Sequence, residues 1–285
     1  MFTTLISARE LQQLMASGAP LRVYDCSFEL MKPDAGAEQY AQAHIPGSVY
    51  VHLDHHLSDK QGADSASGGR HPLPSRETFA RRMASLGLSD GVQAVVLDRQ
   101  GANYCGRLWW MLKWCGHEAV AVLDGGLAAW QAAGGAVDTG PSPSPEPGNF
   151  TLQPAAAQTA STRSIVQSLG RPTQTLIDAR AGARFRGEVE PLDPVAGHIP
   201  GALNRPFAEN IGPDGRFKPA AQLRAEFEQL LAGRDPASVV HHCGSGVSAI
   251  PNLLAMEVAG LGRTALYPGS WSEWCNTPDA PCAVG

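Results

Sequence analysis

The chain contains the same series of sequence motifs twice. The tetrapeptide His-Ile-Pro-Gly occurs at residues 44–47 and again at 198–201, which is 154 residues later. An apolar run that ends in aspartate precedes each copy, with Asp25 and Asp178 in corresponding places. Further along, the segment VLDGGLAAW has its counterpart in LYPGSWSEW. Because the landmarks recur in the same order, an internal duplication explains them better than chance, and we expect two similar folding units.

A proline-rich stretch separates the two copies. Residues 141–148 read PSPSPEPG, and alternating prolines enter neither a central strand nor the interior of a helix. The sequence therefore predicts a first domain at 1–140, a linker at 141–148 and a second domain at 149–285. At these lengths each domain is large enough to bury a core of its own.

Short β-branched runs alternate with helical patterns in both halves. We expect strands at 21–25, 93–98, 119–123, 174–178, 238–242 and 265–267, and helices that include 8–16, 76–86 and 249–259. Strands that alternate with helices predict an α/β fold, in which each half has a mostly parallel sheet with helices on both faces. In such sheets, ligands bind beyond the carboxyl ends of the strands.

Charge and composition exclude several classes of partner. A net charge of −5 offers no basic field for nucleic acid. We expect no secretory signal, because the N-terminal residues contain no basic segment that leads into an apolar core. We also expect no membrane partner, since no apolar stretch approaches the length of a membrane span. The six cysteines are scattered, with no CxxC pair. This pattern favours reduced thiols in the cytoplasm over disulfides or a zinc site, and we expect neither a metal nor a cofactor.

The segment VVHHCGSGVSA at 239–249 predicts a buried strand, a tight turn that starts at Cys243, and a helix. Gly244 and Gly246 allow the backbone to bend so that N–H groups point inward, next to the positive end of the helix. Such surroundings favour the thiolate form of Cys243, which is then a nucleophile. The same N–H groups, continued by Val247 and Ser248, would hold an added anionic sulfur. The alternative is a buried structural cysteine in a strand-to-helix turn.

Other uses of this loop have weaker support. A phosphatase of this design needs an arginine six positions after the cysteine, but residue 249 is alanine, and no Gly-Lys-Ser/Thr sequence follows for nucleotide binding. Counting back from the matched glycines Gly125 and Gly269 puts Arg99 at the place of Cys243. We therefore expect the first half to lack the nucleophile.

Together these motifs resemble the tandem-domain rhodanese family. The resemblance is carried by the two HIPG motifs, the strands that end in aspartate, ARFRG at 183–187, CGSGVSA at 243–249 and LYPGSWSEW at 266–274. It implies an inactive first domain and a catalytic second domain. It also implies a cycle in which a small-molecule donor gives sulfur to the cysteine as a persulfide, which then passes it to a thiol or cyanide acceptor. Thioredoxin, a protein with a reactive thiol, is one such acceptor.

Within this family, the residues after the cysteine indicate the donor. Members that prefer thiosulfate usually carry basic side chains there, whereas Gly244, Ser245 and Gly246 are neutral. This loop resembles that of the 3-mercaptopyruvate sulfurtransferases, whose donor needs mainly an anchor for its carboxylate. Two alternatives stay open, a thiosulfate sulfurtransferase and a non-catalytic persulfide carrier.

The resemblance also implies further site residues. Ser245, His71 and Asp54 match a relay that assists deprotonation, in which the carboxylate orients the imidazole. Arg184, in ARFRG, matches the arginine that binds the substrate carboxylate, a task that suits a planar guanidinium. The family commonly has a second anchoring arginine further along, but here the acidic segment 188–193 stands in its place.

Overall fold

The structure is a computed structural model that describes residues 1–62 and 64–285. Contacts in space divide it into two compact units. The first unit comprises Met1–Asp59, Pro74–Ala156 and Pro213–Phe217, and the second comprises Lys60–Leu73, Ala157–Gly212 and Lys218–Gly285. The predicted domains at 1–140 and 149–285, with the linker at 141–148, are limits along the sequence and stay predictions.

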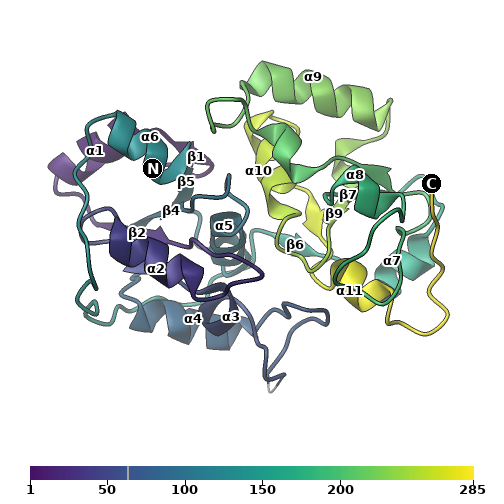
Figure 1. Cartoon of the computed structure of the whole chain (residues 1–285), viewed down its shortest axis with the longest axis horizontal. Helices are drawn as coiled ribbons and strands as arrows, with labels where there is room; N and C mark the ends of the chain where they lie inside the picture. The colour runs from purple at the N-terminus through teal and green to yellow at the C-terminus, as the bar shows by residue number, and fades with distance from the viewer. Residues whose placement is uncertain (63) are drawn as a thin grey trace. The chain divides into compact units, whose positions relative to one another are not determined.

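The described residues of the first unit form a parallel five-stranded sheet in the order β1-β5-β4-β2-β3 (Figure 1). Its strands are β1 (Leu5–Ile6), β2 (Leu21–Asp25), β3 (Val49–Tyr50), β4 (Gln93–Leu97) and β5 (Val120–Leu123). Its helices are α1 (Ala8–Ala16), α2 (Ala35–Gln42), α3 (Leu53–His56), α4 (Arg76–Ser85), α5 (Cys105–Trp114) and α6 (Gly126–Ala132).

The second unit repeats this topology, with a parallel five-stranded sheet in the order β6-β10-β9-β7-β8. Its strands are β6 (Gln158–Thr159), β7 (Thr175–Asp178), β8 (Leu203–Asn204), β9 (Val239–His242) and β10 (Ala265–Leu266). Its helices are α7 (Thr162–Ser168), α8 (Gly182–Phe185), η1 (Phe207–Asn210), α9 (Ala220–Leu231), η2 (Pro236–Ser238), α10 (Ile250–Val258) and α11 (Ser270–Trp274).

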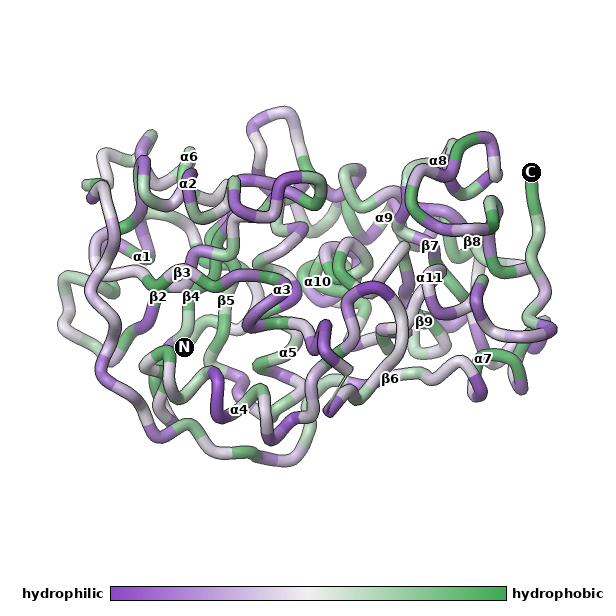
Figure 2. Tube along the Cα trace, turned by 60° about the horizontal axis from the view of Figure 1, so that its bottom comes forward, coloured by the Kyte–Doolittle hydropathy of each residue, from purple (hydrophilic) through white to green (hydrophobic). Residues whose placement is uncertain are grey.

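Helices cover both faces of the sheet in the first unit. In Figure 2, α1, α2 and α6 lie on one side of β2, β4 and β5, and α4 and α5 lie on the other. All residues of β4 and β5 are buried, as expected for parallel strands with two covered faces. The predicted α/β fold with a mostly parallel sheet in each half is therefore confirmed.

Local signals in the sequence placed helices α1 and α4 well. Helix α1 spans the predicted residues and begins with a capping box in which the Ser7 side chain accepts from the Glu10 N–H and the Glu10 side chain accepts from the Ser7 N–H. The Ser75 side chain likewise caps α4, by accepting from the Thr78 N–H. The short strands β1, β3, β6 and β8 were not predicted, because two residues carry too little periodicity to be recognised.

The HIPG histidines have the same structural role in both units. His44 Nδ1 lies 2.8 Å from the carbonyl oxygen of Tyr40 and stacks on the ring of that residue. His198 Nδ1 lies 2.8 Å from the carbonyl oxygen of Phe185 and stacks on the Phe185 ring. These histidines fix the helix that precedes them, so their recurrence reflects folding. In the second unit, this contact holds the end of α8, which carries Arg184.

Candidate functional site

Cys243 follows directly on β9 and is buried, with 2% of its surface exposed. Its N–H donates to Ser270 Oγ at 3.1 Å, and its carbonyl oxygen accepts from the Trp271 N–H at 2.9 Å. The Gly244 carbonyl oxygen accepts from the Ser272 N–H at 2.9 Å. The start of α11 therefore fixes the backbone at the cysteine, while β9 supplies its position at the carboxyl end of the sheet.

The turn after Cys243 requires glycine at Gly246. This residue has φ +73°, and a methyl group on it would lie 2.2 Å from the carbonyl oxygen of Pro268. Val247 is buried, Ser248 is half-buried, and α10 begins at Ile250. The predicted strand, tight turn and helix are thus present. The roles of Gly244, Gly246, Val247 and Ser248 in holding substrate stay predictions.

Two of the predicted relay residues lie together. His71 Nδ1 and Ser245 Oγ are 2.7 Å apart, in a hydrogen bond whose donor depends on the imidazole tautomer. Both residues are buried, His71 to 2% exposure and Ser245 to 7%. His71 belongs to the second unit, because the segment Lys60–Leu73 packs with that unit although it precedes α4 in the chain. The structure therefore brings an imidazole and a hydroxyl to the turn that begins at Cys243.

Asp54, the third predicted member of the relay, lies in the first unit. It is the second residue of α3, and its N–H donates to His52 Nδ1 at 3.1 Å. A role for Asp54 in orienting His71 stays a prediction.

Arg184 lies on α8 and points toward the cysteine loop. A methyl group placed on Gly244 would lie 3.6 Å from Arg184 Nη1 and 3.0 Å from Arg70 Nη2. Arg184 Nη2 donates to Glu190 Oε1 at 2.6 Å and to Asp193 Oδ2 at 3.3 Å. Arg70 Nη1 donates to Asp193 Oδ1 at 2.6 Å. Two guanidinium groups, each held by buried acids, therefore face Gly244.

Sequence reasoning missed Arg70. The only available signal was its place directly before His71, in a polar loop for which the sequence gives no fold. Sequence reasoning treated the acidic segment 188–193 as a loss of cationic anchoring. In the structure, Glu190 and Asp193 instead orient the two arginines. Burial raises the pKa of Glu190, but N–H groups of Arg184, Leu192 and Asp193 outweigh burial and hold the pKa below its ordinary value.

A buried ion pair supports the base of the site. Arg180 forms a fork with Asp178 at the end of β7, where Nη2 donates to Oδ2 at 2.6 Å and Nε to Oδ1 at 3.1 Å. The same guanidinium lies 4.8 Å from the ring centre of Trp271. Trp271 is completely buried.

The two histidines before Cys243 occupy separate environments. His241 Nε2 lies 3.2 Å from Met256 Sδ, and burial lowers the pKa of His241 to about 3. His242 Nδ1 lies 3.8 Å from Asp178 Oδ2, and burial lowers the pKa of His242 although Asp178 opposes this. Over residues 1–62 and 64–285, no three side chains of His, Cys, Asp or Glu are grouped as metal ligands.

The prediction that Arg99 occupies the place of Cys243 in the first unit was wrong by one residue. Asp25 pairs with Leu97, and Asp178 pairs with His242, so the residue after each central strand is Asp98 in one unit and Cys243 in the other. The count went wrong because it ran back from glycines beyond β5 and β10, and α5 has one residue more than α10, 10 residues against 9. The first unit still has no cysteine at this place. Arg99 instead pairs with Asp25 at 2.9 Å.

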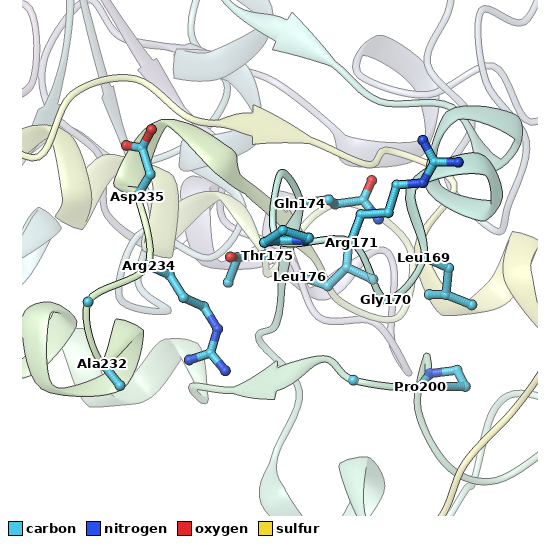
Figure 3. A pocket seen from close by; sticks show the side chains of 13 residues that line it. Leu169, Gly170, Arg171, Gln174, Thr175, Leu176, Pro200, Ala232, Arg234 and Asp235 are labelled. Carbon is cyan, nitrogen blue, oxygen red and sulfur yellow. The ribbon is translucent and has the colours of Figure 1, made fainter.

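A separate hollow of about 550 Å³ lies at the other end of the second sheet (Figure 3). It is lined by residues next to the starts of β7 and β9, among them Thr175, Arg171, Arg234 and Asp235. Cys243 follows the opposite end of β9. This hollow is therefore distinct from the cysteine site.

None of the helices in the described chain is both long and apolar enough to cross a membrane.

Comparison with known proteins agrees with this geometry. The family model of the rhodanese-like domain matches residues 7–133 and 161–277. A Pseudomonas aeruginosa protein named "Probable 3-mercaptopyruvate sulfurtransferase" is 46% identical over 279 residues, which cover 96% of each chain. A Mycobacterium tuberculosis protein named "Putative thiosulfate sulfurtransferase SseB" is 40% identical over 285 residues, covering 99% of this chain and 97% of the relative.

The crystal structure of SseA from Escherichia coli, described as a 3-mercaptopyruvate sulfotransferase with the rhodanese fold, superimposes with a TM-score of 0.79 at 31% identity. It covers 95% of this chain and 100% of the solved one. The match in both halves, the repeated sheet topology and the cysteine loop lead to one conclusion. The chain belongs to the family of proteins built from rhodanese-like domains.

Proposed function

We propose that this chain is a sulfurtransferase that takes sulfur from 3-mercaptopyruvate and carries it as a persulfide on Cys243. The observation that carries the proposal is the arrangement around one turn: Cys243 at its start, the Ser245–His71 hydrogen bond of 2.7 Å beside it, and Arg184 facing Gly244. The names of the Pseudomonas and Escherichia coli proteins support the same donor. We assign the nucleophile to the second predicted domain, 149–285, and propose that the predicted domain 1–140 has no nucleophile of its own, although its segment Lys60–Leu73 packs with the second unit and supplies His71.

The first half-reaction balances without a cofactor. The Cys243 thiolate attacks the sulfur of 3-mercaptopyruvate, an S–S bond forms, and the bond between sulfur and carbon breaks with its electrons on the carbon. The proton of the donor thiol passes to that carbon, giving pyruvate. Ser245 and His71 would move this proton, because an imidazole next to a hydroxyl accepts and returns protons near neutral pH. Arg184 would bind the donor carboxylate, and Asp54 would orient His71.

In the second half-reaction, a thiolate or cyanide attacks the outer sulfur and restores the Cys243 thiolate. Splitting the transfer in this way replaces one difficult step with two easier ones. The N–H groups of Gly244, Gly246, Val247 and Ser248 would stabilise the outer sulfur of the persulfide. A role for thioredoxin as the thiol acceptor, and a cytoplasmic location, stay predictions.

The charges beside the loop favour a monoanionic donor. Arg70 and Arg184 are two cations, and Glu190 and Asp193, which bind them, are two anions. A dianion such as thiosulfate therefore gains little net attraction, whereas a carboxylate gains directed N–H donors. The Mycobacterium relative named for thiosulfate keeps a thiosulfate sulfurtransferase as the second candidate.

Intact mass after incubation with each donor tests the proposal. We expect one added sulfur on the parent with 3-mercaptopyruvate, less with thiosulfate, and none on Cys243→Ser. Steady-state rates with the two donors complete the test, and a strong preference for thiosulfate would support the second candidate. Sulfur loading without repeated turnover with small acceptors would indicate a persulfide carrier.

A further inference from the structure

Two guanidinium groups converge on the residue after the nucleophile, although the motif analysis led us to expect one. Arg184 Nη1 and Arg70 Nη2 lie 3.6 Å and 3.0 Å from the position that a methyl group on Gly244 would occupy. They come from distant parts of the chain, one from α8 and the other from the segment Lys60–Leu73. Both parts belong to the second unit.

A shared acid orients the pair. Asp193 accepts from Arg70 Nη1 through Oδ1 at 2.6 Å and from Arg184 Nη2 through Oδ2 at 3.3 Å. Asp193 and Glu190 have side-chain exposures of 3% and 4%, whereas those of Arg70 and Arg184 are 23% and 18%. Because a guanidinium is rigid and planar, fixing one edge by a buried acid also fixes the direction of the remaining N–H groups.

Part of this donor capacity is unused. Arg70 Nε is buried and has no hydrogen-bond partner within residues 1–62 and 64–285. In the same guanidinium, Arg70 Nη2 is the atom nearest to a methyl group placed on Gly244, followed by Arg184 Nη1. Buried donors are normally paired, so an orphaned donor next to a nucleophilic loop indicates a missing acceptor.

The backbone of this segment is held rigidly. Gly69 has φ +86°, and a methyl group on it would lie 2.5 Å from the carbonyl oxygen of Gly269. The Arg70 N–H donates to Ser272 Oγ at 2.9 Å, and Ser272 also donates its N–H to the Gly244 carbonyl oxygen. The next residue, His71, bonds to Ser245. One short segment therefore fixes Arg70 and His71 against the same turn.

We infer that Arg70 is the second anchor for the donor carboxylate and so determines donor specificity. From the sequence we expected no second anchor, because the acidic segment 188–193 stands where the family commonly has its second arginine. The inference rests on the proposed function. Arg70 Nη2 and Arg184 Nη1 bind the carboxylate oxygens of a small 2-oxo acid that carries a thiol.

The test compares two donors that differ only in the carboxylate. 3-Mercaptopyruvate carries it, and 1-mercapto-2-propanone has the same thiol and ketone without it. For Arg70→Gln we expect the ratio of kcat/KM for 3-mercaptopyruvate to that for 1-mercapto-2-propanone to fall about 10- to 100-fold, mainly through KM, since one charge-assisted hydrogen bond is lost. Arg70→Lys should recover part of the ratio, because it keeps the charge but not the planar fork.

Arg186→Gln is the matched control. Arg186 lies two residues after Arg184, is exposed, and pairs with Glu188 at 2.7 Å, so its removal should leave the ratio unchanged. An equal loss with both donors in Arg70→Gln would overturn the inference, because it would show a structural role only. So would an unchanged ratio. Failure of the proposed function looks different, since the parent itself would then gain no sulfur on Cys243 from 3-mercaptopyruvate.

Discussion

The loop that begins at Asp98 and the loop that begins at Cys243 share one backbone design. Each follows the central strand of its sheet, and each reaches a glycine with positive φ three residues later, Gly101 at +67° and Gly246 at +73°. Each leads into a long buried helix, α5 or α10, after the same number of residues. The frame is therefore common to both units.

The two loops differ in what fills them. Asp98 Oδ1 accepts from the N–H groups of Gln100 and Ala102 at 2.9 and 3.0 Å. Asp98 Oδ2 accepts from those of Tyr104 and Cys105 at 2.7 and 2.8 Å. The first unit thus surrounds its own carboxylate. A strand-turn-helix of this kind can therefore surround a carboxylate with backbone N–H groups. We propose that in the second unit the corresponding N–H groups receive an anion supplied from outside.

Replacing the nucleophile should have the largest effect. In Cys243→Ser we expect turnover to fall on the order of 10⁴-fold or more, because covalent transfer is lost. Sulfur loading measured by intact mass should be lost with it. Cys105→Ser is the control, since Cys105 begins α5 in the other loop and burial raises the pKa of its thiol well above the ordinary value. Sulfur found on Cys105 would contradict the contrast between the loops.

Removing the internal anion should damage the first unit. Asp98→Ala leaves four backbone N–H groups without their acceptor in a buried loop, so we expect the free energy of unfolding to fall by about 3–5 kcal/mol. Denaturation in urea measures this change. Asp90→Ala is the control, because the exposed Asp90 also accepts from a backbone N–H, that of Thr151 at 3.0 Å, and its loss should cost less than about 1 kcal/mol. Equal losses would mean that Asp98 does not organise its loop.

Matched positions within the turns should respond differently. Ser245 and Gln100 each stand two residues after the first residue of their loop. Ser245 is hydrogen-bonded to His71 in the candidate site, whereas the Gln100 side chain donates to Gln39. We expect Ser245→Ala to lower kcat by about 10²-fold through lost proton transfer. Gln100→Ala should leave kcat unchanged, and a comparable loss there would refute the assignment of catalysis to the second unit.

The smallest effect concerns pH. The Glu190 pKa is held below its ordinary value of 4.5 by its hydrogen bonds, against the effect of burial. A lowered folded-state pKa contributes stability above the unfolded value, and this contribution is lost as the pH falls through the folded pKa. We expect Glu190→Gln to be less stable than the parent by about 1 kcal/mol or less at pH 7, and the difference to shrink below pH 4.5. Thermal unfolding across pH 3–7 measures it, and a difference that grows in acid would contradict the ion-pair role.

The sequence predicted those features that depend on local pattern or repetition. The duplicated order of landmarks fixed the architecture, and the glycines after Cys243 fixed the turn. Asp98 escaped prediction because a one-residue difference between the halves shifts any count made from the far side of a helix, and only strand pairing resolves it. Arg70 escaped because its role depends on where an irregular polar segment packs, which neither periodicity nor propensity determines.

The packing of Lys60–Leu73 with the second unit has a consequence for how the chain can be divided. A fragment that starts at the proline-rich linker would retain Cys243, Ser245 and Arg184, but would leave Arg70 and His71 behind on the other piece. The two copies therefore ceased to be interchangeable after duplication, since one now supplies a loop that the other needs. Exchange of halves between relatives should succeed only when this loop travels with the cysteine it accompanies.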